Sequence, residues 1–300
     1  MELHQLRYMV AVAETGNFTR ASERCHITQP SLSQQVLNLE KEVGHKLFHR
    51  LGRKAVLTEA GATFLERARR ILFEVEDATK ELKDSPSLDR QITVGAVPTV
   101  APYLLAPLIA RCRETHSNLV VHVREDFRSD LTRAVIEGDL DLAVITLPMK
   151  DHRLSIEPLL TEPLLLVVGK RHPLAGRSDI TANDLAEETF VTMGDSSTLA
   201  AQIRGFCGDH NFAPKIGYRC AQVATLKLFV AMGAGISILP QVAQLPADRE
   251  TLSYLRLADS VPTRELAVIR HLQRYQSRGA EQFLALLREQ ARTSASPPAS

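Results

Sequence analysis

The strongest constraint on the fold lies in the first 60 residues, where short helical segments precede a basic hairpin. Apolar residues at three- and four-residue spacing predict a first helix over residues 3–14, which Gly16 ends. Asn17 is suited to cap a second helix that runs to Cys25, and Pro30 fits the first turn of a third helix. Two short helices joined by a tight turn are typical of a helix-turn-helix.

The third helix separates apolar from polar side chains. Its apolar face holds Leu32, Val36, Leu39 and Val43, and its opposite face holds Ser31, Gln34, Asn38 and Lys41. Hydroxyl, amide and ammonium groups suit contacts with base edges and phosphates in a DNA groove. The same separation is also typical of an ordinary amphipathic surface helix. The helix alone therefore does not distinguish a DNA-binding helix from a surface helix, and the residues that follow it are needed.

A short basic hairpin follows the third helix. Residues 48–57 form two extended runs around Gly52, with Arg50, Arg53 and Lys54 near the tip. Residues 1–58 contain eight Lys and Arg against five Asp and Glu, whereas the whole chain has a formal net charge of only +1. A basic hairpin beside a helix-turn-helix is a wing, which contacts the sugar-phosphate backbone and adds salt-dependent affinity.

Together these segments resemble the DNA-binding domain of LysR-type transcription regulators. The resemblance rests on the run ASERCHITQPSLSQQV at residues 21–36 and on shorter matches at 39–40, 44, 47–50 and 57–61. It implies a winged helix-turn-helix that binds double-stranded promoter DNA. It also implies that the groove-facing residues are Thr28, Gln29, Pro30, Ser31, Ser33, Gln34 and Asn38, and that the wing residues are Arg50, Arg53 and Lys54.

A long helix is predicted after the wing. Residues 59–84 contain no proline and a single glycine, Gly61. The positions that repeat at three- and four-residue spacing are Leu65, Ala68, Leu72, Val75, Thr79 and Leu82. This seam suits a coiled coil between two chains, which the family resemblance favours, although the same spacing also fits a helix packed on its own domain. Ser85 and Pro86 are expected to break the helix.

From residue 88 onward, strand-like apolar runs alternate with helical stretches. The predicted strands cover residues 91–97, 120–123, 140–145, 164–168, 189–193, 236–239 and 266–269. The predicted helices cover residues 101–115, 128–137, 199–210 and 223–233. This alternation favours an α/β domain with an open sheet, in which ligands bind at a crevice outside the strand ends.

The same region resembles the effector domain of LysR-type regulators and, more distantly, periplasmic solute-binding proteins. The matching segments are residues 94–95, 102–105, 138–144, 172–174 and 230–240. The resemblance implies two lobes joined by two chain crossings, near residues 160 and 265, with a small-molecule effector in the cleft between them. The expected organisation is a DNA-binding domain at 1–58, a linker and dimerisation helix at 59–87 and an effector domain at 88–300, with lobe I at about 88–160 and 266–300 and lobe II at about 161–265.

Helix N-termini with hydroxyl side chains nearby predict the effector site. Their free N–H groups bind carboxylates and other anions, so the expected effector is a small anionic molecule. This chemistry selects Thr99, Ser196, Ser197 and Thr198, with Pro98 and Val100 as the neighbours of Thr99. Position in the family adds Thr146, Gln222, Val223 and Thr225. The same Ser and Thr side chains also fit plain helix caps.

Four cysteines, Cys25, Cys112, Cys207 and Cys220, are too widely spaced for a disulfide framework or a metal site. Residues 25–30, 98–105 and 205–207 are similar to the OxyR-like subgroup of the LysR-type family. This subgroup senses peroxide with a reactive cysteine nine residues before a resolving one, and Thr198 and Cys207 have that spacing here. Thr198 cannot form a sulfenic acid, so peroxide sensing of that type is not expected. Buried, inert thiols are expected, and redox signalling through Cys207 and Cys220 stays open as the alternative.

Enzymes and secreted binding proteins are the main competing classes. The chain has no GxGxxG motif that opens a helix and no GxxxxGK[ST], GxSxG or HExxH motif, so we expect no enzyme activity, cofactor or metal. No apolar stretch reaches the roughly 18 residues of a membrane span, and the N-terminus is not typical of a signal peptide, so a cytoplasmic protein is expected. A solute-binding protein would begin with a secretion signal instead of a basic winged helix.

The sequence therefore predicts a LysR-type, DNA-binding transcription regulator whose promoter binding or DNA bending responds to a small-molecule effector. We expect a homodimer through the long helix and a homotetramer that presents two pairs of DNA-binding heads. The tail at residues 293–300, rich in Ser, Ala and Pro, is expected to be disordered.

Overall fold

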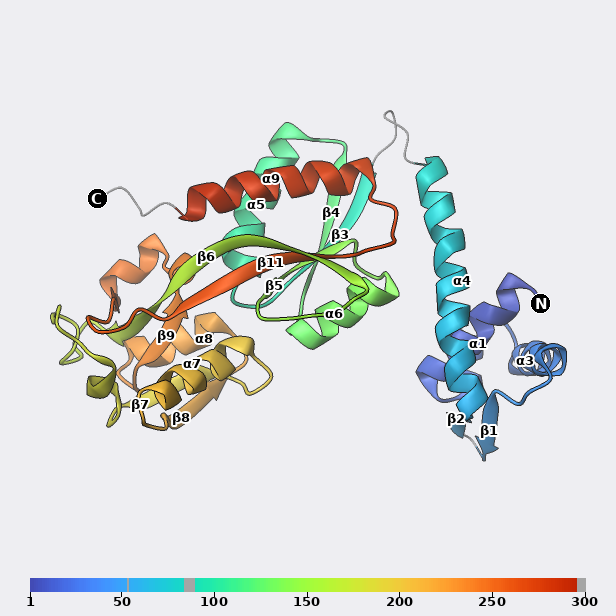
Figure 1. The fold of residues 1–300 in the computed structure, drawn as a ribbon, viewed down its shortest axis with the longest axis horizontal. Coiled ribbons are helices and arrows are strands. Elements are labelled where there is room, and N and C mark those ends of the chain that lie inside the picture. The colour runs from blue at the N-terminus through green and yellow to red at the C-terminus, as the bar shows by residue number, and fades with distance from the viewer. Residues whose placement is uncertain (53, 84–89, 296–300) are drawn as a thin grey trace. The chain divides into compact units, whose positions relative to one another are not determined.

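The chain folds into two units, Met1–Lys83 and Asp84–Ser300, each with its own hydrophobic interior (Figure 1). The computed structural model describes residues 1–52, 54–83 and 90–295. We call the two parts the N-terminal unit and the effector unit. The predicted wing residue Arg53 and the predicted helix break at Ser85 and Pro86 lie outside the described residues.

The N-terminal unit contains the helices α1 (Leu3–Thr15), α2 (Phe18–Arg24), α3 (Gln29–Val43) and α4 (Glu59–Lys83) and the strands β1 (Phe48–Leu51) and β2 (Lys54–Leu57). Local sequence accounts for its first helix boundaries. Gly16 ends α1 in a left-handed conformation with a φ of 61°, which glycine adopts without strain. The Asn17 side chain then accepts hydrogen bonds from the N–H groups of Thr19 and Arg20, at 2.8 and 3.1 Å, and caps α2.

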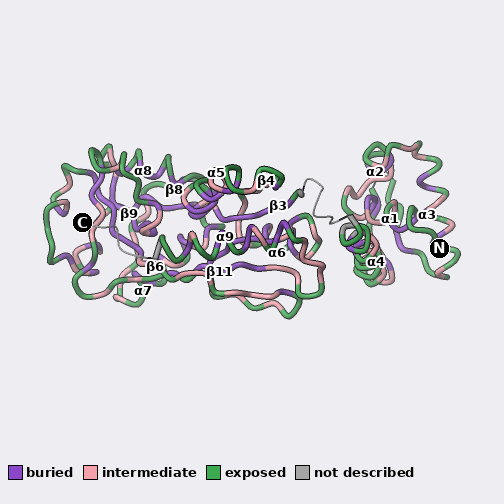
Figure 2. Tube along the Cα trace, turned by 90° about the horizontal axis from the view of Figure 1, so that it is seen from above, coloured by how far each residue is buried: buried purple, intermediate pink, exposed green. Residues whose placement is uncertain are grey.

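A single apolar core joins α1, α2, α3 and the wing. Its buried side chains include Leu6, Met9, Val12, Ala21, Leu32, Val36, Leu39, Leu47, Phe48 and Ala55. Along the tube of this unit in Figure 2, buried positions alternate with intermediate and exposed ones. Glu40 also links α3 to the start of the wing, because its Oε1 accepts hydrogen bonds from the N–H groups of Leu47 and Phe48 at 2.7 and 3.1 Å. The wing therefore starts at a fixed position relative to α3.

The helix α4 divides the predicted heptad seam into two parts. Ala68 is fully buried, and Leu65 and Leu72 pack against the core of the N-terminal unit. In the second half, Thr79 is exposed and the Leu82 side chain is 89% exposed. The first half of the helix therefore packs on its own unit, which fits the alternative that the sequence left open, because packing on α1 requires the same residue spacing. The seam between two chains stays a prediction.

The effector unit contains the strands β3 (Arg90–Ala96), β4 (Leu119–Glu125), β5 (Leu142–Thr146), β6 (Leu154–Gly169), β7 (Thr189–Met193), β8 (Lys215–Cys220), β9 (Ser237–Pro240), β10 (Leu252–Leu255) and β11 (Thr263–His271). Its longer helices are α5 (Ala106–Thr115), α6 (Arg128–Glu137), α7 (Thr198–Asp209), α8 (Val223–Ala231) and α9 (Arg278–Ala295), with the short turns η1 (Ala101–Leu105), η2 (Ala182–Leu185), η3 (Gln241–Ala243) and η4 (Pro246–Glu250). The main sheet has the order β10-β6-β11-β5-β3-β4, with β9 paired to β6, and β7 and β8 form a separate parallel pair.

The effector unit has two hydrophobic cores. The first lies among β3, β4, β5, the end of β11 and the helices α5, α6 and α9, and we call this part lobe I. The second lies among the end of β6, the strands β7, β9 and β10 and the helices α7 and α8, and we call this part lobe II. The long strands β6 and β11 run antiparallel through both lobes (Figure 1), and their register shifts between Leu266 and Ala267.

The structure departs from the prediction at several elements of the effector unit. The strand predicted at 164–168 is the end of the longer β6, whose first half contains Pro158 and Pro163, residues that disfavour a strand assignment. The prediction did not include β8, β10 or α9. The predicted disordered tail is wrong at its start, because α9 continues through Thr293, and residues 296–300 lie outside the described residues.

Gly61 is the residue at which α4 passes the backbone of the wing. A Cβ atom at this position would lie 2.0 Å from the carbonyl oxygen of Leu47, which already accepts a hydrogen bond from the N–H of Thr58 at 3.0 Å. We therefore expect Gly61→Ala to lower the free energy of unfolding of the N-terminal unit by about 2–3 kcal/mol, because backbone has to move. Urea unfolding followed by circular dichroism measures the change.

The control for this substitution is Glu66→Ala on an exposed position of the same helix. A surface change of this kind is expected to stay within about 0.5 kcal/mol of the parent protein. Equal stabilities of the two variants would contradict the tight contact at Gly61.

Candidate functional site

The start of α3 presents most of the predicted groove-facing residues on the surface. Thr28, Pro30, Ser31 and Gln34 are exposed, and Gln29 and Asn38 are half-buried. The Gln34 side-chain amide donates a hydrogen bond to Asn38 Oδ1 at 3.0 Å, which arranges two amides side by side. An ordered pair of amides is suited to the paired donors and acceptors of a base edge.

Ser33 differs from its neighbours because its side chain faces the wing. It is 9% exposed, and its Oγ accepts a hydrogen bond from Arg50 Nη1 at 2.9 Å. The Arg50 guanidinium also lies over the ring of Phe18, 4.5 Å from its centroid. Arg50 therefore links α2, α3 and the wing, while Lys54 stays exposed on the wing. The geometry gives Ser33 and Arg50 a role in positioning the wing, and their contacts with DNA stay predictions.

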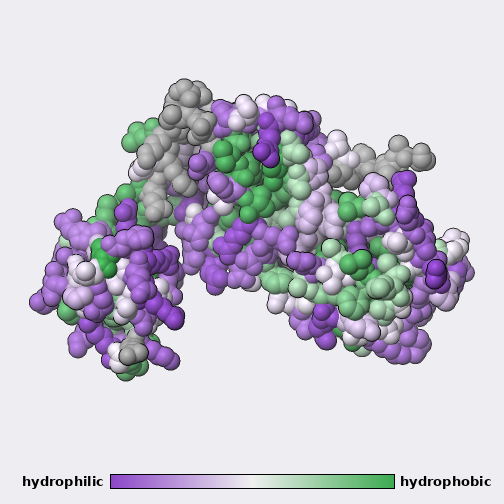
Figure 3. Space-filling view, turned by 180° about the vertical axis from the view of Figure 1, so that it is seen from behind, coloured by the Kyte–Doolittle hydropathy of each residue, from purple (hydrophilic) through white to green (hydrophobic). Residues whose placement is uncertain are grey.

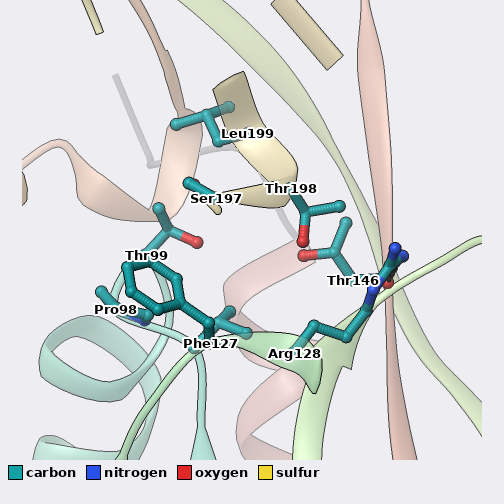
Figure 4. Close-up of a pocket in the computed structure, with 9 residues that line it drawn as sticks. Pro98, Thr99, Phe127, Arg128, Thr146, Ser197, Thr198 and Leu199 are labelled. Atoms are coloured by element: carbon teal, nitrogen blue, oxygen red, sulfur yellow. Dashed lines mark hydrogen bonds between the residues drawn. The ribbon is translucent and has the colours of Figure 1, made fainter. Parts of the chain in front are cut away.

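In the effector unit, one pocket brings residues of both lobes together (Figure 4). Its lining residues are Val97, Pro98, Thr99, Phe127, Arg128, Thr146, Ser197, Thr198 and Leu199. The first six lie just after β3, at the start of α6 and at the end of β5 in lobe I, and the last three lie at the N-terminus of α7 in lobe II. Figure 4 shows the hydroxyl groups of Thr146 and Thr198 facing each other from the two lobes.

The pocket contains five of the ten residues selected from the sequence: Pro98, Thr99, Thr146, Ser197 and Thr198. The other five do not line it: Val100 and Val223 are buried in the two cores, and Ser196, Gln222 and Thr225 are exposed. The prediction missed Phe127 and Arg128. Their position at the N-terminus of α6 follows the same rule that selected Ser197 and Thr198, so the sequence contained the information.

The pocket is small and mostly polar at its base. Thr99, Thr146 and Ser197 are 4%, 2% and 8% exposed, and the open volume is about 10 Å³, close to the space that a single water molecule needs. The Arg128 guanidinium extends along one side and donates hydrogen bonds to the carbonyl oxygens of Thr146 and Pro148 at 3.3 and 3.0 Å. Hydroxyl groups and a cation thus surround a compact space.

A larger groove of about 510 Å³ is lined by residues that are close in sequence to those of the pocket. Its lining residues are Leu147, Pro148, Met149, Ile156, Gln202, Thr263, Arg264 and Glu265. Leu147 directly follows the pocket residue Thr146, and Gln202 lies one helical turn after Thr198 on α7. The groove has an apolar wall and a size typical of small-molecule sites.

A buried ion pair supports the base of the pocket. The side chain of Arg264 on β11 is 0% exposed, and its Nε and Nη2 donate to Glu162 Oε1 on β6 at 2.9 and 2.7 Å. Burial lowers the pKa of the Arg264 guanidinium, whereas the Glu162 carboxylate acts in the opposite direction. Arg264 also donates to the hydroxyl and the carbonyl oxygen of Thr99, at 2.7 and 3.1 Å.

A second buried charge cluster lies in lobe II. Lys227 on α8 donates to Asp248 Oδ2 at 2.6 Å, and Tyr254 OH donates to the same oxygen at 2.7 Å. The Lys227 ammonium lies 5.3 Å from the ring centroid of Tyr103, which belongs to η1. Burial and then the nearby Asp248 carboxylate raise the pKa of Tyr103 to about 12. Burial alone would raise the pKa of Asp248, but the hydrogen bonds from its partners lower it overall.

All four cysteines are free, and three of them, Cys112, Cys207 and Cys220, are buried. Burial raises the pKa of Cys207 to about 11, and burial also raises the pKa of Cys220. A thiol with a raised pKa is a weak nucleophile at neutral pH because little thiolate is present. The alternative of redox signalling through Cys207 and Cys220 therefore has no support in their surroundings.

Comparison with known families decides the assignment. Residues 3–62 match the family described as bacterial regulatory helix-turn-helix protein, lysR family, and residues 86–292 match the LysR substrate binding domain. The chain belongs to the LysR family of transcription regulators. Members of this family are generally not enzymes, and a helix-turn-helix joined to an effector-binding domain is the family's typical organisation.

Individual LysR-family proteins are similar over nearly the whole chain. The DNA-binding transcriptional dual regulator OxyR of Escherichia coli strain K12 is 33% identical over 272 residues, which cover 90% of this chain and 89% of OxyR. The Hca operon transcriptional activator HcaR of the same strain is 34% identical over 242 residues, which cover 80% and 82% of the two chains. Among solved structures, a full-length OxyR variant from Pseudomonas aeruginosa has a TM-score of 0.71 and 26% identity, with 97% and 98% coverage.

Two further properties of this LysR regulator concern the described residues alone. No helix in residues 1–52, 54–83 and 90–295 is long and apolar enough to cross a membrane. In the same ranges, no group of three His, Cys, Asp or Glu side chains is placed to hold a metal ion.

The raised pKa of Cys207 predicts slow reaction with thiol reagents. Relative to the ordinary value of 9.0, a pKa of about 11 leaves about 100-fold less thiolate at pH 8. In a variant that keeps Cys207 as its single cysteine, we expect Ellman's reagent to label the native protein at least about 100-fold more slowly than the urea-unfolded protein. Labelling at equal rates would show that the thiol is accessible and would restore the redox alternative.

Proposed function

We propose that this LysR regulator binds promoter DNA through the start of α3 and the wing, and that a small anionic effector in the pocket modulates promoter binding or DNA bending. The observation that carries the proposal is the meeting of Thr99, Thr146, Ser197 and Thr198 with Arg128 in one pocket lined by both lobes. A ligand held by both lobes favours the closed arrangement of the lobes. We also propose that the protein acts in the cytoplasm, where promoter DNA lies.

The pocket chemistry supports an anion. The first residues of α6 and α7, Arg128 and Thr198, both line the pocket. The first N–H groups of a helix have no partner within the helix and carry a partial positive charge. Ser197 precedes α7 without a side-chain cap hydrogen bond, so its hydroxyl is not used as a plain N-cap. The neighbouring groove offers room for an apolar remainder of the effector.

The proposed assembly is a homotetramer built from homodimers. The exposed end of α4, with Leu82, offers the dimer contact between two linker helices. In the effector unit, Val120 and Val123 on the edge strand β4 are 42% and 45% exposed, and Leu228 and Met232 at α8 are 65% and 87% exposed. Figure 3 shows hydrophobic residues gathered on one face of this unit. Exposed apolar patches of this kind mark contacts between proteins, here with a second copy.

The proposed DNA contacts predict two different effects of substitution. Lys54→Ala on the wing removes a phosphate contact, so it is expected to weaken binding to all sequences alike and to reduce the slope of log K against log salt by about 1. Gln34→Ala removes an amide at a base edge, so it is expected to change sequence preference at a cost of about 1–3 kcal/mol. Fluorescence anisotropy with operator and scrambled duplexes at several salt concentrations separates the two.

The reverse pattern, with altered sequence preference for Lys54→Ala and uniform weakening for Gln34→Ala, would contradict the assigned roles. Glu66→Ala, which changes an exposed residue of α4, serves as the control for expression and folding.

The proposed effector pocket predicts a specific thermal shift of the full-length protein. A ligand at a hundredfold excess over its Kd adds about 2.7 kcal/mol of stability, which raises the Tm by several degrees. We expect a shift within a panel of small carboxylates, aromatic acids, sugar phosphates and amino acids, and we expect Thr198→Ala to abolish it.

The matched control is Ser196→Ala, an exposed neighbour that does not line the pocket. A shift that survives Thr198→Ala, or one that Ser196→Ala removes equally, would place the ligand elsewhere.

A further inference from the structure

The Thr99 hydroxyl at the base of the pocket is held by an arginine from a strand that runs through both lobes. Arg264 Nη1 donates to Thr99 Oγ1 at 2.7 Å, and Nη2 donates to the Thr99 carbonyl oxygen at 3.1 Å. Both residues are buried, with Thr99 4% and Arg264 2% exposed. The two hydrogen bonds fix the side chain and the backbone of Thr99 together.

This contact determines whether the Thr99 hydroxyl donates or accepts a hydrogen bond in the pocket. A guanidinium has donors and no acceptor, so Thr99 Oγ1 is the acceptor in the contact. The hydroxyl proton then has to point elsewhere, and Arg264 is the only side-chain partner of this oxygen among residues 1–52, 54–83 and 90–295. Figure 4 shows the Thr99 oxygen facing the pocket. Thr99 therefore offers its proton to whatever occupies the pocket.

The charge of Arg264 acts in the same direction. Glu162 Oε1 accepts hydrogen bonds from Nε and Nη2 of the guanidinium. The second carboxylate oxygen, Oε2, accepts a hydrogen bond from the Val242 N–H at 2.8 Å. Within the described residues, Nη1, the nitrogen that contacts Thr99, has no contact with this carboxylate. The hydroxyl is therefore polarised by a cation in a buried site, where electrostatic interactions are stronger than in water.

We infer that Arg264 is a positioning residue that makes the effector pocket selective for hydrogen-bond acceptors, so that it binds a compact anionic group in preference to a neutral group of the same shape. Arg264 does so through Thr99 and does not itself line the pocket of about 10 Å³. The small volume favours a compact group, and a carboxylate, which is larger than a water molecule, enters only when the lining side chains move outward. The inference rests on the proposed function because it concerns the same pocket.

The test compares acetate with acetamide, which share a shape and differ in charge and in one acceptor. Both probes, labelled with ¹³C at the methyl group, are titrated into the full-length protein, and binding is followed by NMR line broadening. We expect the parent protein to bind acetate at least tenfold more tightly than acetamide. We expect the ratio to fall severalfold in Thr99→Val, which removes the hydroxyl but keeps the shape and leaves the helix N-termini and Arg128 in place, and to be restored in Thr99→Ser.

The variant that tests Arg264 itself is Arg264→Met combined with Glu162→Met, which removes both buried charges together. Replacing a whole buried ion pair with apolar side chains is tolerated far better than removing one partner. We expect the acetate preference of this double variant to fall as far as that of Thr99→Val, whereas a purely structural role of the pair would leave the ratio unchanged. Thr115→Val, at an exposed threonine of α5, is the control for a Thr-to-Val change.

The outcomes separate the inference from the proposed function. The inference would be overturned if the folded double variant or Thr99→Val kept the full acetate preference. In that case the proposed anion pocket would still hold if Thr198→Ala weakened acetate binding. A parent protein that binds the two probes equally, or acetate binding that Thr198→Ala leaves unchanged, would overturn the proposed anion pocket together with the inference. Should the double variant fail to fold, the comparison of Thr99→Val with Thr99→Ser decides alone.

Discussion

The buried pair of Arg264 and Glu162 is the interaction on which the effector unit depends. The two residues lie opposite each other on β11 and β6, the strands that run through both lobes. A buried charge without its partner costs about 3–5 kcal/mol, so each residue fixes the position of the other. Because Arg264 also holds Thr99, the pair sets the geometry of the pocket and of the strands with the same few hydrogen bonds.

The polar contacts continue from this pair into lobe II. Glu162 accepts a hydrogen bond from the N–H of Val242 in η3, and the next carbonyl oxygen, that of Ala243, accepts one from Lys227 on α8. Lys227 in turn contacts Asp248 and lies over Tyr103 of η1. Buried polar groups have no water to replace a lost partner, so a change at one of these hydrogen bonds requires the others to adjust. The pocket, the crossing strands and α8 are thereby mechanically connected.

The sequence predicted the winged helix-turn-helix and the α/β effector unit because their periodicity and turn residues are local. Gly16, Asn17 and the apolar face of α3 act within a few residues of their partners. The sequence could not separate the two halves of α4, because packing on α1 and packing on another chain require the same spacing. It also missed the Arg264–Glu162 pair, which joins residues 102 positions apart. The sequence did indicate this pair in one respect, since Glu162 and Arg264 carry opposite charges and lie near the two expected chain crossings.

The pocket also explains why half of the residues predicted for it lie elsewhere. Hydroxyl groups at helix starts were selected by type, but a helix N-terminus directs only its first residues into a site. Ser197 and Thr198 therefore line the pocket, whereas Ser196, one residue earlier, points to the surface. Thr198 has a further consequence, because a hydroxyl binds by hydrogen bonds and does not form the oxidised states of a thiol. With Cys207 in the core of lobe II, the chemistry of this pocket fits the proposed signal, which is reversible occupancy by an effector, better than oxidation of a thiol.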